Sequence, residues 1–150
     1  MFDDLRDLYQ EVILDHGRRP RHGSRLAAFD VSAKGDNPMC GDRVQVFVRR
    51  DADGRVAEAG FEARGCAISI ASADLMAEVI AGRSPDEVRV LADAFRNMAR
   101  NGEAPEGDAA IERLRPLAGV HEYPSRVKCA TLPWHALLAA LDGKGDATSE

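Results

Sequence analysis

Three cysteines and one aspartate are the residues of this 150-residue chain whose types and spacing could do metal chemistry. Cys40 and Asp42 stand two residues apart, while Cys66 and Cys129 lie far along the chain. Three thiolates and one carboxylate are enough to complete a tetrahedral zinc site. No two cysteines have the Cys-x-x-Cys spacing of a zinc ribbon or a thioredoxin-like redox centre, so the fold must assemble any such site. A thiolate cluster assembled in this way is more typical of a working centre than of a local structural staple.

Each of these residues also has a simpler interpretation. A lone cysteine is often a small buried hydrophobic residue, and Asp42 could be a turn residue after Gly41. An odd number of cysteines argues against a disulfide framework and favours reduced thiols or metal. His16 ends a predicted helix, where a charge or hydrogen bond at the C-terminus is favoured over metal binding. Trp134 is expected in the core, and the other histidines are candidate ligands by type: His22, His121 and His135.

The composition and charge restrict the class of protein. A hydrophobic fraction of 45% and a charged fraction of 30% are typical of a globular chain, and 150 residues predict one domain over residues 1–150. The net charge of −5 argues against nucleic acid as the main partner. No apolar stretch is long enough to cross a bilayer, and the acidic N-terminus lacks the pattern of a signal peptide. These features predict a cytoplasmic protein that binds neither nucleic acid nor membrane.

An amphipathic helix and a β-hairpin are predicted in the first half of the chain. The helix ends near Gly17, and its apolar stripe comprises Leu5, Leu8, Tyr9, Val12 and Ile13. The basic run after it, residues 18–22, is a solvated turn or a docking spot for an acidic partner surface. Residues 18–39 are expected to be mostly loop, with a short strand around 29–31. Alternating residues then predict a hairpin whose strands contain Val44, Val46 and Val48 and residues 56–64.

Helices are predicted for the second half of the chain. They cover residues 66–81, residues 85–100 after the capping box at Ser84, a short segment capped by Asp108, and a last helix carrying Trp134, Leu137 and Leu141. Gly65 precedes the first of them, at a join that needs an unusual backbone angle. Pro133 fits only near the first turn of the last helix, which places Cys129 just before or at its start. Residues 1–4 and 143–150 are expected to be flexible.

These elements would bring the chemical groups to one end of the sheet. Cys40 and Asp42 stand at the entrance of a strand, so both side chains can project to one face. The return strand of the hairpin leads to Cys66, at a helix N-terminus where free amide groups and the helix dipole favour a thiolate. Cys129 would supply the fourth corner. A carboxylate is a harder and weaker zinc ligand than a thiolate, so Asp42 would make the site more labile.

Four segments, in order along nearly the whole chain, carry a family resemblance. They are LYQEVILDH at residues 8–16 with Pro20-Arg21, NPMCGDR at 37–43, FEARGCAIS at 61–69 with Ala71-Ser72-Ala73, and RVKCATL at 126–132 with Trp134. Together they resemble the SufU family of the IscU/NifU N-terminal-like superfamily, the zinc-dependent sulfurtransferases of the SUF iron–sulfur cluster system. The resemblance implies an α+β fold, with a small antiparallel sheet of about three strands covered by helices on one side.

The resemblance also implies a site and a partner. The implied Zn²⁺ ligands are Cys40, Asp42, Cys66 and Cys129. The partner would be a pyridoxal-phosphate cysteine desulfurase of the SufS type, and a histidine of that enzyme would replace Cys40 on zinc. The freed Cys40 thiolate would accept the persulfide sulfur and pass it to a downstream SUF assembly scaffold. Arg126 would assist ligand exchange or docking, although a surface salt bridge would explain it equally well.

Two differences separate the chain from the related IscU scaffold proteins. Those proteins carry a histidine immediately before their last cysteine, where this chain has Lys128. In addition, residues 95–114 resemble an insertion of the SufU family that IscU proteins lack. Both differences favour sulfur transfer over an alternative in which the chain is an IscU-like scaffold that builds an iron–sulfur cluster on the same cysteines. A third hypothesis is a structural zinc protein, in which the metal only stabilises the fold.

Overall fold

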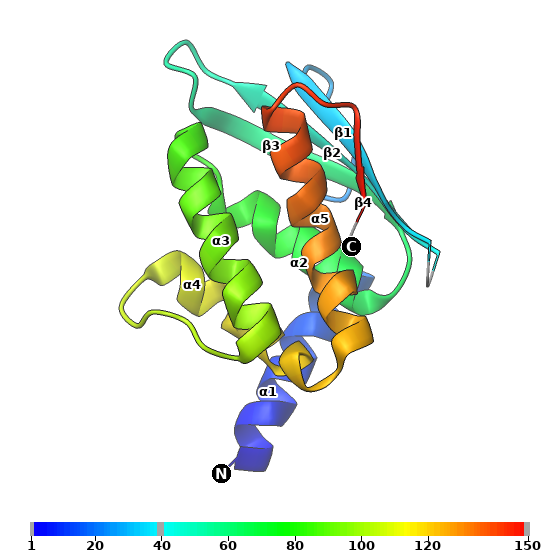
Figure 1. The fold of residues 1–150 in the computed structure, drawn as a ribbon, viewed down its shortest axis with the longest axis vertical. Helices are drawn as coiled ribbons and strands as arrows, with labels where there is room; N and C mark the ends of the chain where they lie inside the picture. Colours follow the sequence, from blue (N-terminus) through cyan, green and yellow to red (C-terminus); the bar gives the residue numbers. More distant parts are fainter. Residues whose placement is uncertain (1, 39–40, 149–150) are drawn as a thin grey trace.

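A four-stranded sheet carries the helices on one of its faces in the computed structural model, which describes residues 2–38 and 41–148 (Figure 1). Its antiparallel strands are β1 (Val31–Asn37), β2 (Asp42–Arg50) and β3 (Val56–Arg64). A short strand, β4 (Asp146–Thr148), runs parallel to β1, so that the order is β3-β2-β1-β4. The predicted α+β class with about three antiparallel strands is confirmed. The polar sequence after Gly143 gave no signal for β4, because this strand depends on backbone pairing with β1.

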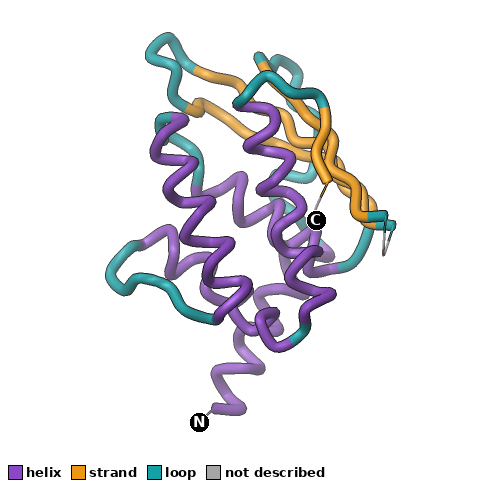
Figure 2. Tube along the Cα trace, in the orientation of Figure 1, coloured by secondary structure: helices purple, strands orange, loops and turns teal. Residues whose placement is uncertain are grey.

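The helical layer, purple in Figure 2, lies beside the orange strands of the sheet. It consists of α1 (Phe2–Arg18), α2 (Ala67–Val79), α3 (Pro85–Asn101), α4 (Ala109–Leu114), the 3-10 helix η1 (Arg115–Glu122) and α5 (Pro124–Leu141). The predicted helix starts are confirmed, because Ser84 forms both hydrogen bonds of a capping box and the Asp108 carboxylate accepts two backbone N–H groups of α4. In the part of the chain that the structure describes, no helix is long and apolar enough to cross a membrane.

The β2–β3 hairpin forms where the alternating valines predict it. The valines of β2 are buried against the helical layer. At the turn, the Asp51 carboxylate accepts the backbone N–H groups of Asp53 and Arg55 at N–O distances of 2.9 and 3.0 Å. Gly54 has φ +82°, a value that side-chain-bearing residues rarely adopt. The hairpin places the start of β2 beside the end of β3, where the candidate ligands lie.

β1 is longer than the short strand predicted around residues 29–31, and that prediction is wrong. The strand pairs with β2 from Val31 to Asn37. A Cβ at Gly35 would lie 3.1 Å from Leu132 Cδ1 and 3.2 Å from Ala136 Cβ, so α5 packs directly against the backbone of β1. The inward positions must therefore be small, and the alternation of large apolar residues that identifies a strand is absent.

α5 corrects the prediction for the last cysteine. The helix begins at Pro124 and continues through Pro133, so Cys129 lies in its second turn and not at or before its start. Pro133 has no N–H with which to bond the carbonyl four residues earlier. Close by, the Ser72 hydroxyl of α2 donates to the carbonyl of Ala130, with an Oγ–O distance of 2.5 Å. Packing against α2 and β1 therefore keeps the proline inside a helix.

The core occupies the space between the sheet and the helices. Trp134 is fully buried and stacks on Phe95 with ring centroids 4.8 Å apart, which confirms its predicted core position. Part of the opposite sheet face is covered by the segment before β1, where Phe29 meets Phe47 at a centroid distance of 5.0 Å. The sheet is thus buried on both faces near the hairpin turn.

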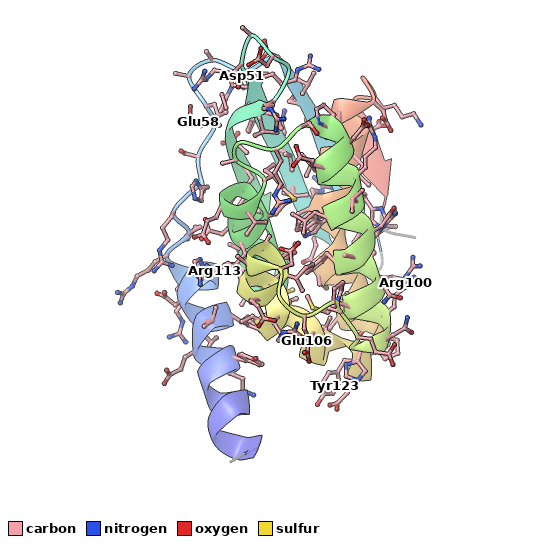
Figure 3. The ribbon with its side chains drawn as sticks, turned by 90° about the vertical axis from the view of Figure 1, so that its left-hand side faces the viewer. Asp51, Glu58, Arg100, Glu106, Arg113 and Tyr123 are labelled. Carbon is pink, nitrogen blue, oxygen red and sulfur yellow. The ribbon has the colours of Figure 1, made fainter. Side chains whose placement is uncertain are left out.

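A buried polar chain joins α1, α2 and α4. His16 Nδ1 lies 2.5 Å from Asp74 Oδ2, and both side chains are almost fully buried. Asp74 Oδ1 accepts the backbone N–H of His22 at 2.8 Å. Arg113 of α4, labelled in Figure 3, has a guanidinium nitrogen 3.3 Å from His16 Nε2 of α1. It also pairs with Glu78 through two hydrogen bonds. His16 is therefore a fixed core histidine rather than a metal ligand.

His16→Ala is expected to lower the free energy of unfolding by about 3 kcal/mol, because it leaves the Asp74 carboxylate buried with one partner fewer. Denaturant unfolding followed by circular dichroism measures the change. Asp15→Ala is the control. Asp15 lies on the same helix, and its pair with Arg21, which follows the helix, is exposed, so its loss should leave the unfolding midpoint almost unchanged. Equal midpoints for wild type and His16→Ala would contradict the stabilising role of this pair.

Candidate metal site

Two thiols and one carboxylate meet at one end of the sheet. Asp42 is the first residue of β2, Cys66 is the N-cap of α2 just after β3, and Cys129 lies on α5. One ligand atom from each side chain lies within 4.8 Å of the other two. The structure therefore brings together three of the four predicted ligands. The fourth, Cys40, lies outside the described residues.

Asp42 is held in place by the start of α2. Its Oδ1 accepts the backbone N–H of Cys66 at 3.1 Å, and its Oδ2 lies 3.7 Å from the Cys66 sulfur. Gly65 has φ +156°, and a Cβ at that position would lie 2.2 Å from Asp42 Oδ1. The unusual backbone predicted at Gly65 is confirmed. Its steric purpose is to let the carboxylate approach the peptide that begins α2.

The two described thiols have different environments. Cys129 is 1% exposed, whereas Cys66 is only partly buried. Burial raises the pKa of the Cys129 thiol well above its ordinary value, and the hydrogen bond with Asp42 and the charge of Cys66 raise it further. A thiolate at Cys129 therefore requires a cation close to its sulfur.

Arg126 is a cationic side chain close to both cysteines. The charge of Cys66 is the largest cause that raises the pKa of the Arg126 guanidinium, followed by a hydrogen bond with Cys129. Arg126 lies in the first turn of α5, three residues before Cys129, and is exposed. The side chain predicted to assist the chemistry is thus beside the predicted ligands and open to a partner.

The donor set suits zinc in chemistry and in spacing. Thiolates bind Zn²⁺ at about 2.3 Å, so two sulfurs of a tetrahedral site lie about 3.8 Å apart. The separations of up to 4.8 Å among the three described donors leave only a small closing movement. Zinc accepts mixed thiolate and carboxylate ligands, and a fourth ligand would complete the tetrahedron.

The histidines lie away from this donor group, which contains none among the described residues. His121 is exposed, and its Nδ1 lies 2.8 Å from the carbonyl oxygen of Ala118. Burial lowers the pKa of His135, and the charges of Arg96 and Arg100 lower it further. Neither imidazole supports the interpretation of these residues as ligands.

Sequence reasoning missed a pair of arginines beside the site. Arg43 of β2 and Arg64 of β3 face each other across the paired strands, an arrangement of like charges that destabilises a sheet. Arg43 has a weak contact with Asp36 at 3.5 Å, and both arginines are exposed. The sequence could have predicted this pair. Arg43 directly follows Asp42, Arg64 lies two residues before Cys66, and the two strands were predicted to form a hairpin. They give this end of the sheet a positive edge.

Comparison with known proteins relates the chain to a family of cluster-assembly proteins. Residues 8–130 match the family model of the NifU-like N terminal domain. The iron–sulfur cluster assembly scaffold protein IscU of Streptococcus pyogenes serotype M1 is 36% identical over 143 residues, which cover 95% of this chain and 88% of that protein. The zinc-dependent sulfurtransferase SufU of Bacillus subtilis strain 168 is also 36% identical, over 134 residues that cover 89% of each chain.

Solved structures show the same architecture. A putative iron–sulfur cluster assembly scaffold protein for the SUF system from Fervidobacterium islandicum superimposes with a TM-score of 0.80 and 31% identity, covering 87% of this chain and 94% of that one. A NifU-like protein (N-terminal) from Brucella abortus gives a TM-score of 0.79 and 25% identity, covering 92% of this chain and 94% of that one.

Proposed function

Because the chain belongs to the NifU-like N-terminal domain family, we propose that it is a zinc-dependent sulfurtransferase of iron–sulfur cluster assembly. The observation that carries the proposal is the group formed by Asp42, Cys66 and Cys129, with the exposed Arg126 three residues before Cys129 in α5. The proposed sulfur donor is a SufS-type cysteine desulfurase, and the proposed recipient is a downstream SUF assembly scaffold, both in the cytoplasm.

Cys40 is the proposed sulfur acceptor and fourth zinc ligand. It stands two residues before Asp42 in the chain, and two extended residues span at most about 7 Å, which keeps it near the other donors. Its thiolate attacks the terminal sulfur of the desulfurase persulfide. A new S–S bond forms at Cys40, the S–S bond of the desulfurase breaks, and the cysteine of the desulfurase leaves as a thiolate. Zinc, when bound, would keep the cysteine ligands deprotonated at neutral pH.

The other site residues have supporting roles in this proposal. Cys66 is the N-cap of α2 and Cys129 lies on α5, and both helices pack in the core. The two cysteines would therefore anchor the ion. Asp42 is the weaker ligand, and its bond to the Cys66 peptide orients it. Arg126 is proposed to stabilise a thiolate that develops at the site and to contact the desulfurase, since its guanidinium is exposed.

A second candidate function is that of a scaffold on which an iron–sulfur cluster is assembled. The name of the Streptococcus pyogenes relative supports it, and sequence identity does not separate the candidates, because both relatives are 36% identical. Lys128 favours sulfur transfer. A protonated lysine offers no lone pair to a metal, and the Lys128 side chain lines a cavity between α3 and α5.

One experiment separates the candidate functions. The purified protein is incubated with a SufS-type desulfurase, its pyridoxal phosphate and cysteine, and desulfurase turnover, zinc content and the visible absorption spectrum are measured together. Faster turnover with zinc retained supports sulfur transfer. A coloured cluster with zinc lost would support the scaffold, and unchanged turnover with zinc retained would support a purely structural metal.

Arg126→Gln is expected to reduce the stimulation of the desulfurase several-fold while the zinc content stays at the wild-type value. The reason is that the guanidinium is close to Cys66 and Cys129 but is not itself a ligand. Arg126→Lys should recover only part of the stimulation, because lysine keeps the charge but not the planar fork of donors. Arg50→Gln, at the far end of β2, is the matched control. If Arg126→Gln stimulates the desulfurase as strongly as wild type does, the proposed role of Arg126 in sulfur transfer is wrong.

A further inference from the structure

We propose that a cavity between the C-terminal half of α3 and the first turns of α5 binds a small, multiply charged oxyanion of the phosphate or carboxylate type. The cavity has a volume of about 250 Å³ and lies apart from the donor group of the metal site. This volume is below the range of about 300–1,000 Å³ that drug-sized ligands occupy, so a small anion suits it better than a cofactor.

The charged side chains that line the cavity are all basic or imidazole groups. They are Arg100 from α3, His121 from η1, and Lys128 and His135 from α5. No aspartate or glutamate of the described residues lines it. In a chain with a net charge of −5, two cations, Arg100 and Lys128, in a cavity that no described acidic side chain lines are unexpected. An oxyanion would supply the missing negative charge and could accept charge-assisted hydrogen bonds from Arg100 and Lys128.

The salt bridges that the described residues form near the cavity do not include Arg100 or Lys128. Arg96, one turn before Arg100, is paired with Asp93, whereas neither Arg100 nor Lys128 forms a salt bridge with a described acidic residue. Like charges four residues apart on a helix repel each other. The lowered pKa of His135, caused by burial and then by Arg96 and Arg100, is consistent with a positive potential at this place.

The His121 ring is fixed at the edge of the cavity. Its Nδ1 lies 2.8 Å from the carbonyl oxygen of Ala118. Gly102, the C-cap of α3 with φ +77°, lies against the ring, because a Cβ there would be 2.8 Å from two ring atoms. Figure 3 shows Arg100 on α3 above this end of the helix, with Tyr123 near the start of α5. A preorganised ring loses little freedom when a ligand binds.

The two cationic side chains of the cavity come from different helices. Arg100 lies in α3 and Lys128 in α5. They are 28 positions apart in the sequence, yet their side chains line the same cavity. The inference does not depend on sulfur transfer, because none of the four basic groups belongs to the donor set.

Isothermal titration of the purified, zinc-loaded protein with inorganic phosphate and, separately, with succinate tests the proposal. Sodium chloride keeps the ionic strength constant, so that general screening contributes equally to every titration. We expect saturable binding of at least one of the two anions. Binding of phosphate alone assigns the site to phosphate groups, and binding of succinate alone assigns it to carboxylates.

The Arg100→Gln/Lys128→Gln double variant should bind the anion roughly tenfold more weakly or worse, because it loses two charge-assisted hydrogen bonds. The Arg50→Gln/Lys144→Gln variant removes the same charge from exposed positions outside the cavity and should bind as wild type does. Circular dichroism checks folding, and the single variant Lys128→Gln replaces the double variant if that one does not fold. No saturable binding of either anion, or equal weakening in both double variants, would overturn the proposal.

Discussion

Cys40→Ser is expected to abolish transfer of sulfur from the desulfurase to this protein. A serine hydroxyl is not ionised at neutral pH and cannot form a persulfide, so no S–S bond can form at residue 40. The three donors Asp42, Cys66 and Cys129 remain in the variant, so part of the zinc binding should survive. The assay incubates the protein with the desulfurase and with cysteine that is radiolabelled at its sulfur. The sulfur carried by the protein is then measured after a single turnover.

The control for this variant must alter a thiol without removing the proposed acceptor. Cys129→Ser serves the purpose, because Cys129 is 1% exposed and cannot reach a partner's persulfide. It should weaken zinc binding, yet Cys40 should still become labelled. Normal labelling of Cys40→Ser would move the acceptor role to another thiol and would contradict the proposed mechanism.

Asp42→Ala is expected to release zinc to a chelator about tenfold faster or more, since ligand-orienting groups contribute at least this much to metal affinity. The substitution removes a ligand and also the acceptor of the Cys66 backbone N–H. Asp42→Asn separates the two effects, because the amide oxygen keeps the hydrogen bond but not the negative charge. Asp36→Ala, at an exposed carboxylate of β1, is the matched control.

Gly65→Ala provides a second variant with the same expected consequence and an intact aspartate. Its Cβ would lie 2.2 Å from Asp42 Oδ1, so either the carboxylate or the start of α2 must move. Gly54→Ala is the control for backbone strain, because Gly54 also has a positive φ but has nothing within 4 Å of the added Cβ. Unchanged zinc retention and exchange in Asp42→Ala would remove Asp42 from the site.

The sequence was sufficient to predict the part of the site that local rules govern. A hairpin brings its two ends together, and this alone places Asp42 next to Cys66. The position of Cys66 at a helix start follows from the change of period after β3. The sequence therefore indicated the residue types of the candidate metal site, and the α+β class was implied by the family resemblance of its motifs.

The rest depends on tertiary packing that no local pattern encodes. Pro133 suggested a helix start, but packing of α5 against α2 and β1 keeps it in the interior, so Cys129 lies a full turn deeper in the helix than predicted. The extent of β1 could not be predicted from alternating apolar residues, because the close approach of α5 requires a small residue at Gly35. The bond between His16 and Asp74 joins residues 58 positions apart, and no local pattern links them.

The most direct test of the central claim is to map the persulfide after one turnover with the desulfurase and to measure zinc in the same sample. Alkylation followed by peptide mass spectrometry locates the added sulfur, and atomic absorption gives the zinc content. The proposed mechanism predicts one added sulfur atom on Cys40, none on Cys66 or Cys129, and zinc retained. Sulfur on Cys66 or Cys129 with Cys40 unmodified, or a cluster in place of zinc, would contradict it.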